Sequence, residues 1–339
     1  MSETEGSMKV CIYGAGAIGG WIGVRLAQAG CALSAVARGA TLDALRRDGL
    51  TLLQGDGQRD SVPIEASDDP AALGAQQLVV VAVKAPALVG VARRIAPLLG
   101  PDTVVLTAMN GVPWWFLEGG FGGTLAGTRL TTVDPDGAIA AAIPAHRVIG
   151  GVVHASCSLE APGVVRHHFG RGLIVGEPSG EATPRAQALH ALLARAGFDA
   201  RLSPQIQKDV WYKLWGNMTV NPISLLTGAT TDRIMDDPLV LGFVSAVMLE
   251  AREIGARLGI PIAERPEDRH AVTRRLGAFK TSMLQDSEAG RAVELDALVG
   301  AVRELGRLTG VATPFTDALF GLARVGAQVR GLYGTGFPK

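Results

Sequence analysis

The first part of the chain alternates short β-rich apolar runs with helical segments. VCIY precedes a helical pattern from about Ala17 to Ala29, and the runs ALSAVA, LVVVAV and TVVLTA are separated by helical patterns near 41–48 and 86–98. Strands that alternate with helices of this length predict βαβ units and a parallel sheet. The later runs RVIGGVVHAS, GVVRHHF and GLIVGE predict further strands of the same domain, antiparallel at its edge.

The pattern changes at EPSGEATPR, residues 177–185, where small polar residues and two prolines interrupt it. We place a domain boundary there. Beyond it the periodicity is almost wholly helical, and helices are expected at 184–196, 204–226, 236–258, 266–285, 291–309 and 314–329. The expected fold class is therefore α/β: an N-terminal domain over residues 8–180 with a parallel sheet, followed by an all-α domain over 184–333, with the active site in the cleft between them.

Composition narrows the class of partner. The 32 basic side chains balance 32 acidic ones without a run of like charge, so no nucleic-acid or membrane surface is indicated and a small molecule is the expected partner. Cys11, Cys31 and Cys157 show no C-x-x-C spacing, which argues against a disulfide framework and favours a reducing cytoplasm. The polar start MSETEGSMKV has no apolar core of a signal peptide, and no apolar run of about 18 residues follows.

One helix carries two organised faces. In WYKLWGNMTVNP, residues 211–222, an apolar stripe follows the i, i+3, i+4, i+7 spacing of a core-facing helix, and a polar stripe recurs every four residues. The apolar stripe is Trp211, Leu214, Trp215 and Met218, and the polar stripe is Lys213, Asn217 and Asn221. Because Asn is a poor helix former, the polar stripe is either a solvated face or a functional one.

The segment YGAGAIGG places Gly14, Gly16 and Gly19 in the G-x-G-x-x-G spacing. It follows a predicted strand and opens a predicted helix, which is the context that a dinucleotide-binding turn of the Rossmann type needs. The first helical residues, Ala17 and Ile18, would then direct free N–H groups and the positive end of the helix dipole at a pyrophosphate. The alternative is a purely structural turn.

The second strand bears on the choice of cofactor. A site for NAD usually offers an acid about 20 residues beyond the glycines, to bind the ribose 2′-hydroxyl. Between Gly20 and Leu42 this chain has no acid, and Arg38 ends the second strand instead. Because a guanidinium can bind a 2′-phosphate through a bidentate fork, Arg38 favours NADP(H), the alternative being an ordinary surface arginine.

Two more strands end in polar residues. LVVVAV leads into Lys84, and TVVLTA leads into Asn110 and Gly111. Taken singly, Lys84 is typical of a solvated strand end and Asn110-Gly111 of a turn. Open α/β sheets bind ligands outside the carboxyl ends of their strands, so both are candidates for the cofactor edge.

These motifs resemble the ketopantoate reductases, NADPH-dependent reductases of 2-keto acids, over nearly the whole chain. The resemblance rests on GAGAIGG, Arg38, Lys84, MNG at 109–111, PGVVRH at 162–167, K-x-x-x-N-x-x-x-N at 213–221 and SMLQD-x-x-x-GR-x-x-E from Ser282 to Glu294. It implies reduction of 2-dehydropantoate to pantoate, or of a close analogue, in pantothenate biosynthesis. It also suggests a homodimer through the helical domain.

The resemblance implies roles for individual residues. Lys213 would be the general acid, because an ammonium stabilises and then protonates the alkoxide that hydride transfer leaves. Glu294 would hold the product hydroxyl or orient the lysine, although it also suits the start of a helix. Lys84 and Asn110 would lie near cofactor and substrate. Further substrate contacts are implied for Asn217, Asn221 and Ser282.

The chain also departs from the family pattern. Phe279 stands where an asparagine is common, and MNGVPWWF, with Trp114 and Trp115, replaces the usual loop after QNG. These differences bear on the acyl pocket, so the substrate is expected to be 2-dehydropantoate or a branched or bulkier 2-keto acid.

Rival interpretations are an opine-type or 3-hydroxyacid dehydrogenase and a non-catalytic NADPH-binding sensor. The set of Lys213, Glu294 and Ser282 favours reduction of a 2-keto acid over both rivals. No metal site is expected, because His167 and His168 are adjacent on a predicted strand and point to opposite faces.

Overall fold

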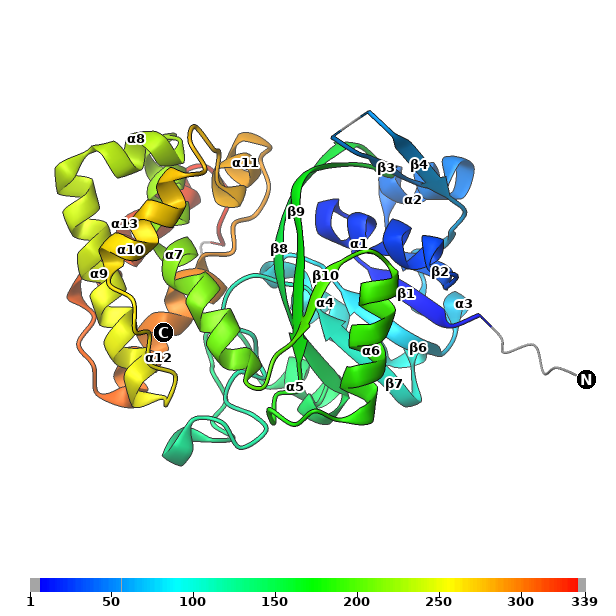
Figure 1. The fold of residues 1–339 in the computed structure, drawn as a ribbon, viewed down its shortest axis with the longest axis horizontal. Helices are drawn as coiled ribbons and strands as arrows, with labels where there is room; N and C mark the ends of the chain where they lie inside the picture. Colours follow the sequence, from blue (N-terminus) through cyan, green and yellow to red (C-terminus); the bar gives the residue numbers. More distant parts are fainter. Residues whose placement is uncertain (1–6, 56, 335–339) are drawn as a thin grey trace, which may run out of the picture. The chain divides into compact units, whose positions relative to one another are not determined.

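The computed structural model describes residues 7–55 and 57–334 (Figure 1). The chain folds into two compact units, which we call the sheet unit and the helical unit. The sheet unit comprises the residues up to Val83, Ala87–Met109 and Ala138–Ile206; the helical unit comprises Lys84–Pro86, Asn110–Gly137 and the residues from Gln207 onward. Two short segments that are early in the sequence therefore belong to the helical unit.

The described part of the sheet unit is built on a ten-stranded sheet. Its strands are β1 (Lys9–Tyr13), β2 (Ala32–Val36), β3 (Leu50–Leu53), β4 (Arg59–Val62), β5 (Glu65–Ser67), β6 (Gln76–Val81), β7 (Leu99–Thr107), β8 (Val148–Ala161), β9 (Val164–Gly176) and β10 (Asp199–Leu202). The order is β4-β3-β9-β8-β7-β6-β1-β2-β5, with β10 pairing to β9. Strands β8, β7, β6, β1, β2 and β5 are parallel neighbours, whereas β8 and β9 are antiparallel. The predicted parallel sheet with antiparallel strands beyond it is confirmed.

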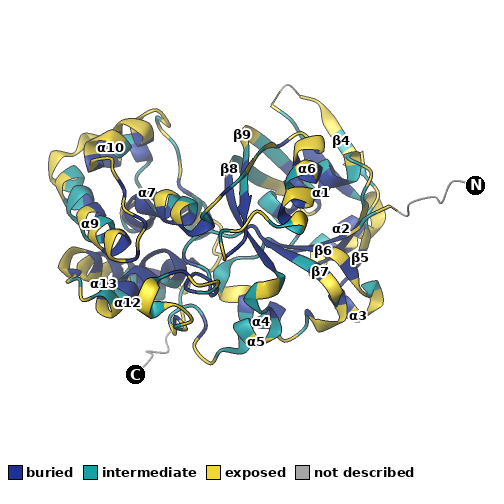
Figure 2. Cartoon of the chain, turned by 60° about the horizontal axis from the view of Figure 1, so that its bottom comes forward, coloured by how far each residue is buried: buried dark blue, intermediate teal, exposed yellow. Residues whose placement is uncertain are grey.

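Helices cover both faces of this sheet (Figure 2). Helices α1 (Ala17–Gln28), α2 (Gly39–Asp48) and α6 (Pro184–Arg195) share a buried apolar cluster with alternate residues of β1, such as Val10 and Ile12. Helices α3 (Pro70–Leu73), α4 (Leu88–Ala92) and α5 (Ala138–Ala142) lie on the opposite face. Because successive side chains of a strand point to opposite faces, Cys11 and Tyr13 point toward this second layer.

Residues 184–206, which the sequence pattern grouped with the helical domain, belong to the sheet unit. Strand β10 pairs in parallel with β9, with Asp199 opposite Gly172, and α6 packs its apolar face into the core of the sheet unit. The four residues of β10, DARL, are few and include two charged side chains, so they lack the apolar run by which the other strands were predicted. The bounds of the compact units therefore differ from those of the predicted domains, 8–180 and 184–333. The domain bounds stay a prediction.

The helical unit contains α7 (Ile206–Thr227), α8 (Thr231–Asp236), α9 (Pro238–Arg257), α10 (Pro266–Arg274), α11 (Ser282–Glu288), the π-helical turn η5 (Asp296–Gly300), α12 (Ala301–Thr309) and α13 (Pro314–Val329). The expected helix at 266–285 is two helices, because Gly277 has φ +62° and Thr281 starts α11 as its cap, its hydroxyl accepting from the Leu284 N–H. The expected helix at 86–98 also breaks, into 3₁₀ turns at Ala85–Ala87 and Ala96–Leu98 around α4.

The apolar stripe of α7 is a core face. Trp211 and Trp215 are each 1% exposed. Their indole N–H groups donate to backbone oxygens of α9, Trp211 to Ala251 at 3.2 Å and Trp215 to Met248 at 2.7 Å. Buried tryptophans with satisfied N–H groups fix the rotation of the helix about its axis. That rotation sets the direction of the polar stripe. No helix in the described residues is long and apolar enough to cross a membrane.

Candidate active site

The polar stripe of α7 brings Lys213 to Asn110. The Lys213 ammonium donates a hydrogen bond of 2.8 Å to the side-chain oxygen of Asn110, which lies three residues after the end of β7. Burial lowers the pKa of Lys213 from its usual value to about 8, and the negative charge of Glu294 opposes that shift. An ammonium with a pKa near neutrality is well matched to proton donation.

A second lysine, Lys84, is held differently. Its ammonium lies 2.6 Å from Asp286 Oδ2 and 3.4 Å from Glu294 Oε2. Burial by itself would lower the pKa of Lys84, but the charges and hydrogen bonds of Glu294 and Asp286 outweigh it and hold the pKa above its usual value. Lys84 is therefore a fixed positive charge, while Lys213 can lose its proton near neutral pH.

Glu294 is fixed from two sides. It is 4% exposed, and besides Lys84 it accepts a hydrogen bond of 3.0 Å from the backbone N–H of Ala85. By the resemblance, Glu294 would hold the product hydroxyl or orient the general acid. The hydrogen bonds join it instead to Lys84 and Ala85, and it acts on Lys213 through its charge.

Asp286 is a further charged residue of this cluster, which the sequence reasoning did not single out. It is 3% exposed, and its two carboxylate oxygens bind Lys84 at 2.6 Å and the Arg291 Nε at 3.0 Å. It ends the SMLQD run, four residues after Ser282. Because residues four apart lie on one helix face, the motif itself pointed to a second functional residue on α11.

The Asn110-Gly111 pair does more than turn the chain. Gly111 has φ +83°, and a Cβ there would lie 2.6 Å from the carbonyl oxygen of Ala297. The next residue, Val112, donates its backbone N–H to that same oxygen at 2.8 Å. Ala297 lies in η5, just after Glu294. The loop that carries Asn110 is thus fastened to the π-helical turn that follows Glu294, and such turns are frequent at functional sites.

The remaining predicted contacts are looser. Asn221 is buried, and its amide nitrogen lies 3.5 Å from the hydroxyl of Ser282 at the start of α11. The Asn217 side chain is half buried and makes no hydrogen bond within the described residues. Trp114 and Trp115 are 4% and 1% exposed, so both pack in the interior.

The glycine turn has the geometry that its spacing predicts. Gly14 has φ +100°, and a Cβ on Gly19 would run into the carbonyl oxygen of Gly14. Gly16, by contrast, has ordinary dihedrals and nothing within 4 Å of the position of a Cβ. It precedes α1, whose first turn receives no side-chain cap, so the N–H groups of Ala17 and Ile18 have no side-chain acceptor. Open space beside Gly16 and an uncapped helix start suit a pyrophosphate.

The predicted residues divide between the units. The glycine turn and Arg38 belong to the sheet unit, where Arg38 directly precedes α2 and is exposed. Lys84, Asn110, Lys213 and Glu294 belong to the helical unit. His167 stacks on Trp21, and the described residues contain no group of three or more His, Cys, Asp or Glu side chains placed to hold a metal.

Comparison with known proteins identifies the family of the chain. The family profile described as Ketopantoate reductase PanE/ApbA matches residues 10–114, and Ketopantoate reductase PanE/ApbA C terminal matches residues 205–327. A 2-dehydropantoate 2-reductase from Mesorhizobium japonicum is 46% identical over 327 residues, which cover 96% of this chain and 100% of that protein. The chain belongs to the ketopantoate reductase family.

Solved structures agree with the family assignment. A candidate ketopantoate reductase from Ralstonia solanacearum is 57% identical with a TM-score of 0.92, over 96% of this chain and 99% of that one. A 2-dehydropantoate 2-reductase from Geobacter metallireducens is 26% identical with a TM-score of 0.80, over 93% and 99%. The resemblance seen in the motifs is confirmed, and with it an oxidoreductase that has a Rossmann-type domain and a helical domain.

Proposed function

We propose that this member of the ketopantoate reductase family reduces a 2-keto acid, 2-dehydropantoate or a close analogue, by hydride transfer from NADPH with Lys213 as the general acid. The observation that carries the proposal is the partly buried Lys213 ammonium, held by Asn110 and with a pKa of about 8. The names of the relatives from M. japonicum and G. metallireducens support the choice of substrate.

The residues of the helical unit suit the proton-transfer half of this reaction. As negative charge develops on the carbonyl oxygen of the substrate, the Lys213 ammonium stabilises it and then donates its proton. Asn110 accepts a hydrogen bond from Nζ and so restricts where that proton points. Glu294 favours the charged form of Lys213, because its negative charge raises the pKa that burial lowers.

Lys84 and the polar side chains of α7 and α11 would position the substrate. Lys84 remains cationic between Glu294 and Asp286, so it offers a permanent positive charge for a carboxylate or phosphate. Asn217, Asn221 and Ser282 add amide and hydroxyl groups on neighbouring helices. These groups suit the carboxylate and hydroxyl of a 2-keto acid and its product.

The residues of the sheet unit fit a nicotinamide dinucleotide. Gly16 and the start of α1 would hold the pyrophosphate, and Arg38 would bind the 2′-phosphate that distinguishes NADPH from NADH. When bound, NADPH supplies the hydride.

A panel of 2-keto acids with NADPH or NADH, followed by the loss of reduced-nicotinamide absorbance, tests the proposal. Turnover is expected with NADPH and 2-dehydropantoate or a bulkier 2-keto acid. An opine-type enzyme would require an added amino acid, and a sensor would bind NADPH without turnover. Near-native turnover of Lys213→Ala would overturn the assignment of the acid.

A further inference from the structure

The C-terminal end of α13 is a tight turn over residues 330–333. Gly331 has φ +68° and donates its backbone N–H to the carbonyl oxygen of Gln328 at 3.0 Å, and Leu332 donates to that of Ala327 at 2.8 Å. This pair of bonds is the Schellman motif, in which a left-handed glycine stops a helix and an apolar residue follows. Leu332 is 4% exposed. We call residues 330–333 the C-terminal clasp, because they bond two other elements of the helical unit.

The first element that the clasp bonds is the end of α7. The Arg330 guanidinium donates to the carbonyl oxygens of Leu225 and, at 3.5 Å, of Leu226. Both oxygens lie in the last turn of α7, where a helix leaves its carbonyl groups without partners and where a positive charge is favourable. Gly326 of α13 is close to the same turn, since a Cβ on it would lie 2.9 Å from the Leu226 side chain. The clasp is therefore anchored on the helix that carries Lys213.

The second element is the segment around Glu294. The carbonyl oxygen of Leu332 accepts a hydrogen bond of 3.1 Å from the backbone N–H of Val293. The Tyr333 hydroxyl donates at 2.6 Å to Oδ1 of Asp296, the first residue of η5. Val293 and Asp296 lie on either side of Glu294 in the chain. The two bonds thus hold the backbone of Glu294 from both sides.

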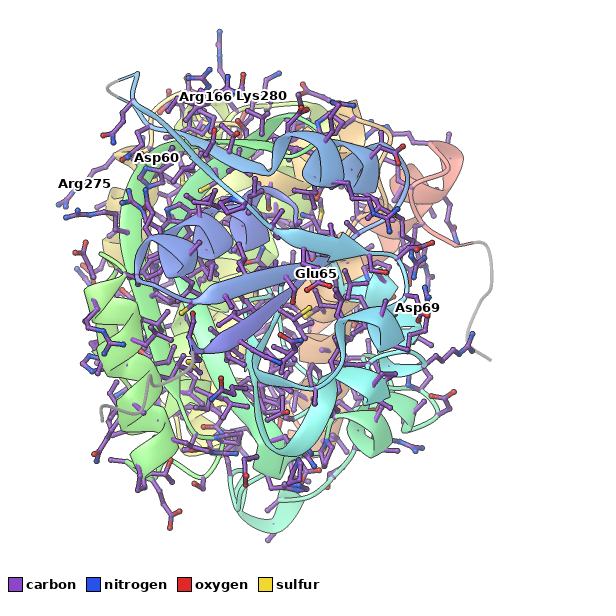
Figure 3. All side chains as sticks on the ribbon, turned by 90° about the vertical axis from the view of Figure 1, so that its right-hand side faces the viewer. Asp60, Glu65, Asp69, Arg166, Arg275 and Lys280 are labelled. Carbon is purple, nitrogen blue, oxygen red and sulfur yellow. The ribbon has the colours of Figure 1, made fainter. Side chains whose placement is uncertain are left out.

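The chain that leads to Glu294 from α11 gives it little support. Residues 288–292 are exposed. Lys280, labelled in Figure 3, pairs with Glu288 at 2.7 Å, but both side chains are half exposed, and exposed ion pairs stabilise little. Burial resumes at Val293, which is 1% exposed and lies before the helical turn, so its N–H has no partner in a helix of its own. The clasp supplies that partner.

We propose that the C-terminal clasp is a positioning element for proton transfer: its Tyr333 holds the backbone of Glu294 where the carboxylate acts on Lys213. Arg330 ties the same clasp to the helix of Lys213, so the two groups share one frame. This inference rests on the proposed function, in which Lys213 is the general acid, and adds Tyr333 and Asp296 to it as positioning residues. Such a frame matters, because a misplacement of about 1 Å can lower a rate about 10²-fold.

Steady-state kinetics of the full-length protein test the clasp, with NADPH and the 2-keto acid that the wild type reduces fastest. Tyr333→Phe removes the hydroxyl that bonds Asp296 and is expected to lower kcat about 3-fold to 10-fold, the range that one hydrogen bond accounts for, with KM for NADPH unchanged. Asp296→Asn keeps an oxygen that accepts from the phenol, so kcat should stay within about 2-fold of the wild type. Tyr212→Phe removes a hydroxyl from an exposed tyrosine of α7 and is the matched control, with wild-type kinetics expected.

A double-mutant cycle shows whether the Tyr333 hydroxyl acts through Glu294. In a Glu294→Gln protein, Tyr333→Phe should change kcat by less than about 2-fold, because the charge that the clasp positions is gone. Hydrogen exchange of the backbone amides at 293–296 is a readout that needs no turnover. Exchange there should be about 3-fold to 10-fold faster in Tyr333→Phe than in Tyr212→Phe, because the segment opens more readily.

The outcomes separate this inference from the proposed function. If Tyr333→Phe keeps wild-type kcat, or lowers kcat equally in the wild type and in Glu294→Gln, the clasp has only a structural role and the inference is overturned. Unchanged exchange at 293–296 in Tyr333→Phe also overturns it, since the hydroxyl then does not hold the segment. The proposed function fails differently: the wild type then reduces no 2-keto acid with NADPH, or Lys213→Ala keeps near-native turnover, and the inference fails with it.

Discussion

Lys213 and Asn110 are 103 residues apart in the chain and are joined by a hydrogen bond of 2.8 Å. The bond connects the polar stripe of α7 to the loop after β7, both within the helical unit. It makes the position of one ammonium depend on two elements that are distant in sequence.

Removing the ammonium should abolish most turnover. Lys213→Ala is expected to lower kcat about 10²-fold to 10⁴-fold, the usual contribution of general acid catalysis, with NADPH affinity unchanged. Steady-state kinetics and cofactor titration measure both quantities. Lys208→Ala, an exposed lysine on the same helix, is the control and should keep wild-type kinetics.

The pH profile should reveal the lowered pKa of Lys213. The protonated form is the acid, so activity is expected to be full below pH 8 and to fall as pH rises through about 8. Because the charge of Glu294 raises that pKa, Glu294→Gln should move the alkaline limb of kcat/KM to lower pH. Glu288→Gln, on the exposed side of α11, should leave the limb in place. A limb that moves upward in Glu294→Gln would contradict the assigned role.

Gly111 should be irreplaceable for steric as well as conformational reasons. Gly111 and Gly120 both have φ +83°, but a Cβ at Gly120 meets nothing within 4 Å, whereas one at Gly111 meets Ala297. Gly120→Ala should therefore lower the free energy of unfolding by about 1–2 kcal/mol, from the left-handed backbone alone. Gly111→Ala should lose about 1–3 kcal/mol more and also lose turnover, because Asn110 moves. Denaturant unfolding and kcat are the measurements, and equal stabilities would refute the steric account.

Asp286 should matter more than a surface carboxylate on the same helix. Asp286→Asn removes the charge between Lys84 and Arg291 and is expected to cost about 1–3 kcal/mol of unfolding free energy, less than for a fully buried pair because both cations are partly exposed. It should also lower kcat, since Lys84 then has Glu294 as its remaining carboxylate. Glu288→Gln, which breaks the exposed pair with Lys280, should cost less than about 1 kcal/mol and leave kcat unchanged.

Substitutions at two glycines of the turn should affect cofactor binding and protein stability separately. Gly16→Ala introduces a Cβ into open space at an ordinary φ of −82°, so stability should be nearly unchanged while NADPH affinity falls, because the methyl group blocks the close approach of the pyrophosphate. Gly19→Ala should instead destabilise the sheet unit through its clash with Gly14. Thermal unfolding and NADPH titration distinguish the two. Unchanged NADPH affinity in a folded Gly16→Ala protein would favour the purely structural turn.

Elements whose signals are local could be predicted well. The helix expected at 314–329 forms at Pro314–Val329, because a proline at its first position and a continuous apolar stripe both lie within the segment. Strands β1, β2, β6 and β7 were likewise visible as short apolar runs between helical patterns, whereas the parallel strands β3 and β5 were not predicted. Elements that depend on a distant partner could not be predicted. β10 is a strand because β9 continues past the residues that pair with β3, and β10 pairs with that later part, Gly172–Val175. The π-helical turn η5 likewise differs from the regular helix that the residues themselves favour.

The sequence by itself determined the chemistry that is available: three glycines at the spacing of a dinucleotide turn, an arginine at the end of the second strand, and a lysine with two asparagines on one helix face. Those are properties of spacing and residue type. Only the tertiary structure decided which lysine can release a proton, since Lys84 and Lys213 have the same side chain. Two carboxylates, Asp286 and Glu294, keep Lys84 charged, whereas Lys213 is buried beside a neutral amide. The pKa of an ammonium depends on burial and on the charges around it. The side chains that bond the two ammonium groups here are 103 to 210 positions away from them in the chain.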